Sequence, residues 1–181
     1  TYSRNVNEVV KITDEIDELS IGGPYTTGVS VVAKEGLPFG TYKGLAPKTN
    51  AQGQVVVDPN TGYPLYTDQE VYLGNYQPDY TASFGANVGY KGFGFNILFD
   101  SKQGGSFVSQ TKFFTEFNGT ADNTATYNRE AFIFPNSVLQ NTDGTFAAND
   151  IEITEQDYFT NYDPSAATYM IDASYLKLRE I

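Results

Sequence analysis

The side chains that most often carry out covalent chemistry are missing, because the 181-residue sequence contains neither Cys nor His. A Cys nucleophile, a Ser-His-Asp triad and a thiolate metal site are therefore excluded. Carboxylates remain, and a pair of them is the catalytic machinery of a glycosidase. With 22 Asp and Glu in the sequence, however, some two carboxylates lie close together by chance, so their presence does not indicate catalysis. We therefore expect no enzyme, no cofactor and no metal centre.

One acidic stretch, DPNTGY at residues 58–63, resembles the start of a calcium loop through Asp58, Asn60 and Gly62. It lacks the further acidic ligands and the downstream bidentate Glu that such a loop requires. The composition is instead that of a tight turn, so residues 54–67 predict a hairpin.

The formal net charge is −11, from 22 acidic and 11 basic residues, and the sequence has no basic stripe. Nucleic-acid phosphates are bound by Lys and Arg, so we expect no nucleic-acid partner. The acids gather in the polar stretches 13–20 and 149–157. A solvated surface is the simplest interpretation of both stretches, and calcium or a basic partner is the alternative.

Polar and apolar side chains alternate over residues 81–100, on both sides of a Lys91-Gly92 dipeptide. A period of two predicts strands, and Gly92 supplies a positive φ for a tight hairpin turn. The expected hairpin has one small, polar face and one aromatic face. The aromatic face carries Phe84, Val88, Phe93, Phe95, Ile97 and Phe99.

Two environments account for such a hairpin. In a soluble β-sandwich the aromatic face is the core and the polar face meets water. In an outer-membrane barrel the aromatic face meets lipid and the polar face meets a wet lumen, with about ten alternating residues per strand. The alternation fits both environments.

Six polar residues would face the lumen in the second environment. Lys177 and Arg179 alternate with Leu176 and Leu178. A cation at the bilayer midplane costs about 2–4 kcal/mol, so the leucines would face lipid. The other interpretation is that the charges pair with neighbouring strands and touch no substrate. The six candidates are Asn87, Asn96, Asp100, Lys102, Lys177 and Arg179.

Two long polar tracts separate the predicted strands, although residues 27–44 hold a further strand, turn and strand. Structureless connections longer than about 15 residues are uncommon in a compact domain, whereas a barrel has short periplasmic turns and long extracellular loops. The chain also begins and ends within strand patterns, so we expect a piece of a larger barrel. The strands are expected over about residues 1–12, 79–90, 93–103 and 171–181, and the extracellular loops over about 13–78 and 104–170.

The second tract is rich in Phe and Tyr. Aromatic residues in such numbers on a loop indicate a small core of its own or a contact surface for another molecule. The candidates for such contacts are Phe113, Phe117, Tyr127, Phe132, Tyr158 and Tyr162.

Four segments follow one another along the chain in this order: YSRNVNEVVKI, KEGLPFGTYKG, LGNYQPDYTASFGANVGYKGFGFNILFDSKQGGSFVSQT and IDASYLKLREI. Together they resemble the C-terminal barrel region of SusC/RagA-type TonB-dependent transporters of Bacteroidetes. The most specific pieces are GNYQPDY, YKGF, the run from Asp100 to Gly105, and DASYLKLRE. The resemblance covers nearly the whole chain.

The resemblance implies an antiparallel transmembrane β-barrel segment, with residues 1–181 forming part of one TonB-dependent receptor barrel domain in the cell outer membrane. It implies uptake of glycans, oligosaccharides or peptides, in contact with membrane lipid and with a SusD-like surface lipoprotein. TonB would act through parts that these residues do not include, among them the plug domain. Two alternatives stay open: a soluble or cell-surface β-sandwich that binds glycans, and a purely structural outer-membrane component.

Overall fold

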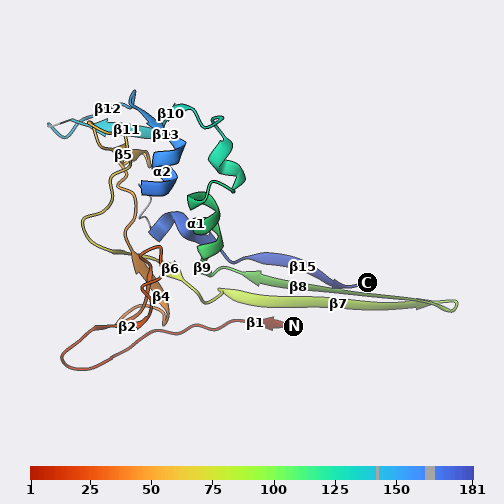
Figure 1. Ribbon diagram of the computed structural model, residues 1–181. Coiled ribbons are helices and arrows are strands. Elements are labelled where there is room, and N and C mark those ends of the chain that lie inside the picture. The colour runs from red at the N-terminus through yellow and green to blue at the C-terminus, as the bar shows by residue number, and fades with distance from the viewer. Residues whose placement is uncertain (142, 162–165) are drawn as a thin grey trace.

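The computed structural model describes residues 1–141, 143–161 and 166–181. The chain is predominantly β, with 43% of residues in strands and 12% in helices, which confirms the predicted class. The strands form several separate sheets, and none of them closes into a barrel within the described ranges. One long sheet projects from a more compact part of the molecule (Figure 1).

The projecting part, here called the long sheet, has four antiparallel strands in the order β1-β7-β8-β15. At its centre is the predicted hairpin, which pairs from Tyr80 opposite Gln103 to Tyr90 opposite Phe93. Its turn residues, Lys91 and Gly92, have φ of 47° and 86°, as a type I′ turn requires. The strands are β1 (Tyr2–Ser3), β7 (Tyr80–Tyr90), β8 (Phe93–Gln103) and β15 (Tyr175–Glu180).

The two outer strands are shorter than predicted. The strand expected over residues 1–12 is reduced to β1, because Val9 exchanges backbone hydrogen bonds of 2.9 Å with Gly36 and Leu37 instead of pairing with β7. The strand expected over 171–181 is interrupted at Ser174. Its N and Oγ donate to Asp172 Oδ1 at 2.8 and 2.6 Å, which turns the chain before β15 begins.

The tract 13–78 is folded, because its strands form a second antiparallel sheet in the order β2-β3-β4-β6. The strand, turn and strand predicted at 27–44 are confirmed by β3 and β4. Val29, Val31 and Tyr42 are buried on this sheet and contact Val108 and Met170 of the other tract. The strands are β2 (Glu18–Gly22), β3 (Ser30–Lys34), β4 (Thr41–Gly44) and β6 (Val71–Asn75).

The hairpin turn predicted at 58–63 is also confirmed. Asp58 Oδ1 accepts hydrogen bonds from the backbone N–H groups of Asn60 and Thr61, at 2.7 and 3.0 Å. Val57 and Pro64 form an antiparallel bridge across the turn. The Asp58 carboxylate is therefore engaged in holding the turn.

The tract 104–170 forms small sheets and short helices, and no helix among the described residues has the length and apolar character to span a bilayer. Strand β11 pairs in parallel with β5 and antiparallel with β12, while β10 pairs with β13 and β9 with β14. The strands are β5 (Val55–Val57), β9 (Ser106–Val108), β10 (Ala131–Ile133), β11 (Ser137–Gln140), β12 (Phe146–Ala148), β13 (Glu152–Thr154) and β14 (Met170–Asp172). The helices are α1 (Gln110–Phe117) and α2 (Glu155–Asn161), with 3-10 turns η1 (Asp122–Ala125) and η2 (Ala166–Tyr169).

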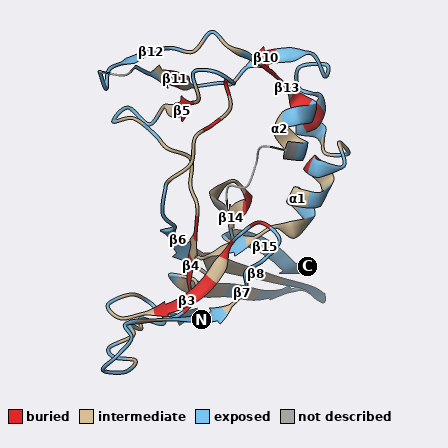
Figure 2. Ribbon diagram, turned by 60° about the vertical axis from the view of Figure 1, so that its left-hand side comes forward, coloured by how far each residue is buried: buried red, intermediate tan, exposed pale blue. Residues whose placement is uncertain are grey.

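Residues 4–79 and 104–174 together are called the head below. The buried residues lie in the head, for example along β3 and in α2 (Figure 2). No residue of the long sheet is buried. The molecule therefore combines a head that has its own core with a long sheet that has none.

Candidate functional site

The register of the long sheet separates its side chains into two faces. Residues directly opposite each other share a face, so Phe84 lies with Phe99, and Lys177 lies with Asp100. Leu178 is opposite Phe99 and therefore joins the aromatic residues. The register thus assigns the residues of the long sheet to two faces. The aromatic face carries Phe84, Val88, Phe93, Phe95, Ile97, Phe99, Leu176 and Leu178, and the polar face carries Asn87, Asn96, Asp100, Lys102, Lys177 and Arg179.

The aromatic face is largely uncovered. Phe93, Phe84 and Phe95 keep 82%, 66% and 51% of their surface exposed. No described part of the head therefore packs over this half of the face, and the hairpin extends away from the head (Figure 1). Burying one large apolar side chain is worth about 1.5–3 kcal/mol, so a contiguous face of this kind indicates an apolar surrounding or partner.

Charged and polar side chains on the other face bind each other across strands. Asp100 Oδ2 accepts hydrogen bonds from Arg179 Nη2 at 2.9 Å, from Arg179 Nε at 3.3 Å and from the Tyr175 hydroxyl at 3.3 Å. Asn96 Nδ2 donates to Glu180 Oε2 at 3.1 Å. Three of the six polar candidates, Asn96, Asp100 and Arg179, thus pair with a neighbouring strand.

The other three candidates on the polar face are less engaged. The Lys177 ammonium lies 4.4 Å from the ring centroid of Tyr175. In the part of the chain that the structure describes, Asn87 and Lys102 make no side-chain hydrogen bond or ion pair. Their polar groups are therefore not engaged by the described side chains of this face.

Tyr175 and Glu180 also belong to the polar face, although the sequence did not single them out. Tyr175 shares the parity of Lys177 and Arg179, so the alternation contained this signal. Glu180 reaches the face because the register shifts by one residue between Leu178 and Glu180. A bulge of this kind has no local sequence signature here.

The aromatic candidates of the second tract mostly contact one another. Phe113 packs edge-on against Tyr169 at 5.3 Å, and Tyr127 stacks on the buried Phe132 at 4.3 Å. Tyr158 contacts neighbouring rings of its own tract. These residues form a small core in the head. Phe117 and Tyr127 keep 46% and 38% of their surface exposed, and Tyr162 lies outside the described residues.

A set of side-chain amides joins three distant segments where the head meets the long sheet. Gln77 Oε1 accepts from Asn5 Nδ2 at 3.0 Å and from Asn7 Nδ2 at 2.8 Å, while Gln77 Nε2 donates to the Phe39 carbonyl at 2.9 Å. Asn7 Oδ1 accepts from the Phe39 N–H at 2.9 Å, and Asn75 Nδ2 donates to the Phe39 carbonyl at 3.0 Å. Residues 5–7, 38–40 and 75–77 are called the clasp below. They come from three of the segments that carry the family resemblance.

An ion pair lies on the second sheet of the head. Lys43 Nζ donates to Glu18 Oε1, and the Tyr72 hydroxyl donates to Glu18 Oε2 at 2.7 Å. The hydrogen bond from Lys43, helped by that from Tyr72, holds the pKa of Glu18 below its ordinary value against the opposing effect of burial. This carboxylate therefore connects β2 to β4 and β6 as long as it is ionised.

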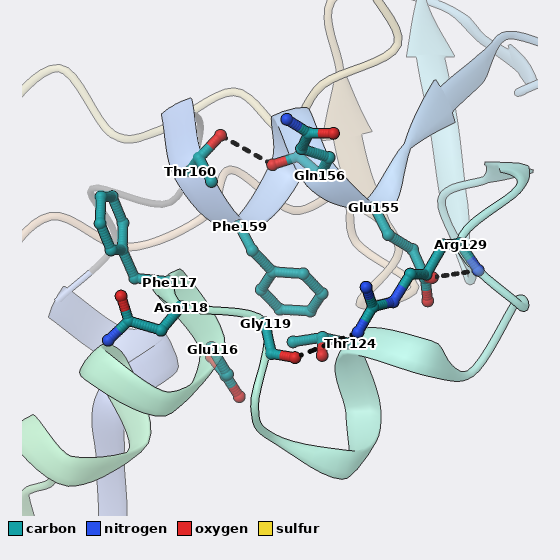
Figure 3. Close-up of a pocket in the computed structure, with 10 residues that line it drawn as sticks. All are labelled: Glu116, Phe117, Asn118, Gly119, Thr124, Arg129, Glu155, Gln156, Phe159 and Thr160. Carbon is teal, nitrogen blue, oxygen red and sulfur yellow. Dashed lines mark hydrogen bonds between the residues drawn. The ribbon is translucent and has the colours of Figure 1, made fainter.

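A hollow of about 300 Å³ lies between α1 and α2, lined by the aromatic rings of Phe117 and Phe159 and by two buried carboxylates (Figure 3). Glu155 accepts from the backbone N–H groups of Tyr127 and Arg129, at 3.1 and 3.0 Å. It thereby holds a turn in which Arg129 has a φ of 62°. Its two oxygens are thus engaged in the fold.

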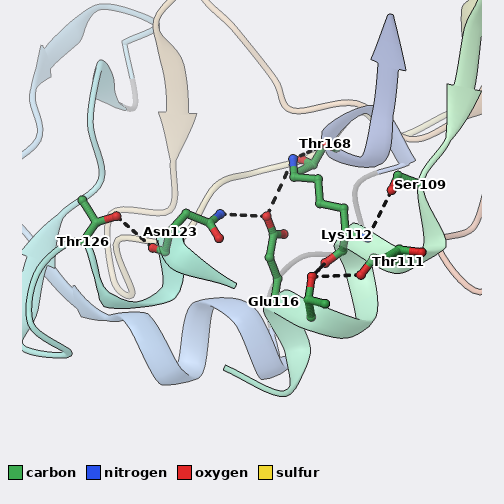
Figure 4. A network of polar contacts seen from close by, with 8 residues as sticks. Ser109, Thr111, Lys112, Glu116, Asn123, Thr126 and Thr168 are labelled. Atoms are coloured by element: carbon green, nitrogen blue, oxygen red, sulfur yellow. Dashed lines mark hydrogen bonds and ion pairs between the residues drawn. The ribbon is translucent and has the colours of Figure 1, made fainter. Parts of the chain in front are cut away.

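The second carboxylate, Glu116, is 2% exposed. Its Oε1 accepts from Asn123 Nδ2 at 2.7 Å and lies 3.8 Å from Lys112 Nζ, which also donates to the Thr168 carbonyl at 2.8 Å (Figure 4). Its Oε2 has no hydrogen-bond partner among the described residues. Glu116 therefore links α1 to η1 through Asn123, while Lys112 links α1 to η2 through Thr168.

Comparison with known proteins supports one class. No protein-family model matches the chain. The chain is similar to a TonB-dependent receptor. That relative is TonB-dependent receptor P3 of Formosa agariphila, which is 25% identical over 130 residues. The match covers 61% of this chain but 13% of the relative, so the chain corresponds to a small part of that protein.

Proposed function

We propose that this chain forms part of the wall and the external head of an outer-membrane, TonB-dependent importer of glycans, oligosaccharides or peptides. The observation that carries the proposal is the uncovered aromatic face of the long sheet, which lies opposite a face of charged and polar residues. Lipid suits the first face and an aqueous lumen suits the second. The similarity to a TonB-dependent receptor supports the same role.

The dimensions of the hairpin fit a bilayer. Tyr80 and Tyr90 lie ten positions apart on β7, with the aromatic face between them. At about 3.3 Å per residue and a tilt of about 40°, this separation spans about 25 Å, the height of the apolar band of an outer-membrane barrel. Tyr2 lies against Tyr80 at 5.5 Å, so tyrosine rings stand at both ends, as in the two interfacial girdles of such barrels.

The edges of the long sheet require further strands in this proposal. Within the described residues, β1 pairs only with residues 81–82 of β7, and β15 pairs only with residues 98–102 of β8. An unpaired backbone group in lipid costs several kcal/mol, which is why membrane sheets close. Other strands of the same barrel would therefore continue the sheet on both sides.

The head would lie outside the membrane and meet the partners. Its exposed rings, among them Phe117, Tyr127 and Phe146, offer anchors for a SusD-like lipoprotein, because aromatic side chains dominate the binding energy of protein interfaces. TonB would act through other parts of the protein.

Depth-matched labels test the proposal. Nitroxide labels at Phe84→Cys and Phe95→Cys are compared with labels at Ser83→Cys and Asn96→Cys in the full-length protein in bilayers. The members of each pair are sequence neighbours on opposite faces, so they share a depth. We expect lipid-soluble oxygen to reach the first two labels and a polar nickel reagent to reach the other two.

The soluble β-sandwich makes the opposite prediction for the same labels. Its aromatic face would be a core, so labels at Phe84 and Phe95 would be shielded from both reagents. That outcome would replace the importer with the second candidate, a glycan-binding module. The hollow between α1 and α2, with its rings and buried carboxylates, would then be the first place to look for a bound sugar.

A further inference from the structure

Charge is distributed very unevenly between the long sheet and the rest of the chain. Residues 80–103 and 175–180 carry four cations and two acids, whereas the remainder carries 7 cations and 20 acids. The sheet therefore has a net charge of +2 in a protein whose remaining residues carry −13. Of the four cations, only Lys91 is at the turn, and the other three lie on the polar face.

Among the described residues, two of these cations share or lack an acidic neighbour: Lys177 is opposite Asp100, which Arg179 already binds, and Lys102 is opposite Tyr175. Arg179 is held by Asp100, and the only other acid of this sheet, Glu180, accepts from Asn96. Among the described residues, neither Lys102 nor Lys177 takes part in an ion pair. The polar face therefore has three cations and two acids, an excess of one positive charge, with Asp100 between Arg179 and Lys177.

The register brings the two lysines together. Lys102 is opposite Tyr175 and Lys177 is opposite Asp100, so the lysines are diagonal neighbours on one face. Such positions lie about 7–8 Å apart, within reach of two long side chains that converge on one group. Lys102 is the second-to-last residue of β8, so the two lysines lie at the end of the long sheet that joins the head.

We propose that Lys102 and Lys177 bind an anionic group, a carboxylate or a sulfate, of the substrate that the protein imports. The proposal rests on the function proposed above, because it requires the polar face to line an aqueous lumen. Each ammonium group donates charge-assisted hydrogen bonds to the anion. The low-dielectric wall of a lumen focuses the field of the two charges and concentrates anions at its mouth.

The test uses the full-length protein in detergent and a pair of probes with one backbone, a short dextran fragment and the same fragment after sulfation. We expect saturable, salt-sensitive binding of the sulfated probe and at least tenfold weaker binding of the neutral one. The double variant Lys102→Gln with Lys177→Gln should lose on the order of tenfold in affinity per lysine. The sulfated probe should also protect both lysines from a water-soluble amine reagent.

Lys91→Gln is the matched control, because it removes the same charge from the same sheet at the turn. Its affinity for the sulfated probe should stay within about twofold of the unaltered protein. Equal binding of the two probes, or equal losses in the control and the double variant, would overturn the inference. A carboxylated probe, an oligogalacturonide, shows which anion is preferred. If the nitroxide labels confirm lipid contact but the probes bind equally, only the anion site fails and the importer stands.

Discussion

Gly40 lies against the ring of Tyr76 so closely that a Cβ at position 40 would be 1.7 Å from the Cε1 atom of that ring. Gly40 also has a φ of 83°, and its carbonyl accepts from the Tyr76 N–H at 3.4 Å. The two residues lie in the clasp, where the head meets the long sheet. This contact requires a residue without a side chain at position 40 as long as Tyr76 keeps its place.

The variant Gly40→Ala should therefore loosen the head. We expect a loss of about 3 kcal/mol or more, because the overlap adds to the strain of a positive φ. The readout is the rate of limited proteolysis within the head of the detergent-solubilised full-length protein. Gly36→Ala is the control, since Gly36 has a φ of 79° and nothing within 4 Å of an added Cβ. Equal effects of the two substitutions would show that the Tyr76 contact does not matter.

Gln77→Ala should weaken the clasp without any steric clash. It removes the acceptor that the Asn5 and Asn7 amides share, which costs about 0.5–1.5 kcal/mol because one of these hydrogen bonds is exposed and the other is part-buried. Thermal unfolding of the head, followed by proteolysis at rising temperature, measures the loss. Gln140→Ala is the control, because Gln140 is an exposed amide of β11. A midpoint no lower than that of the control would contradict the role of the clasp.

The head should lose stability in acid through Glu18. Lys43 and Tyr72 hold the pKa of this carboxyl below its ordinary value of 4.5, so its contribution is present above that pH and is lost as the pH falls through the lower, folded-state pKa. The pair contributes about 1 kcal/mol at most, because part of it meets solvent. Below about pH 4.5 the free energy of unfolding of the Glu18→Gln variant should therefore change less with pH than that of Glu15→Gln, which alters an exposed neighbour. Identical pH profiles of the two variants would show that Glu18 is not the titrating group.

Residues 1–181 expressed alone should aggregate or require detergent. The long sheet would present its aromatic face to water and its unpaired strand edges to other copies. Light scattering and size-exclusion chromatography in plain buffer provide the measurement. A monodisperse monomer with a cooperative melting transition would favour the β-sandwich.

If the proposed function holds, deletion of most of residues 113–162 should leave the full-length protein inserted but unable to retain the proposed SusD-like lipoprotein. These residues hold the exposed rings of Phe117 and Tyr127, and truncated aromatic anchors often cost more than about 2 kcal/mol. Co-purification from solubilised membranes measures retention, and resistance of the variant protein to extraction by alkali serves as the insertion control. Undiminished recovery of the lipoprotein would leave this tract as a lumenal plug or a substrate contact.

The sequence by itself determined the hairpin and the membership of its two faces. Side chains of a strand alternate with a period of two, so the parity of Phe84, Asn87, Phe95 and Asn96 is a local property that no distant contact changes. The same holds for the turn at Lys91-Gly92, because φ preference belongs to the residue itself. The strand and turn at 27–44 were predictable for the same reasons.

Only the tertiary structure decided how residues far apart in the chain meet. Asn7 and Gln77 lie 70 positions apart and Asn96 and Glu180 lie 84 apart, and no local pattern encodes such pairs. Pairing of Val9 with residues 36–37 shortened the first strand, and burial turned Phe132 into the head rather than toward a partner. A polar group bonds to, and a ring packs against, whichever group the folded chain brings near. These contacts therefore depend on the whole fold, whereas the alternation of side chains depends on the strand alone.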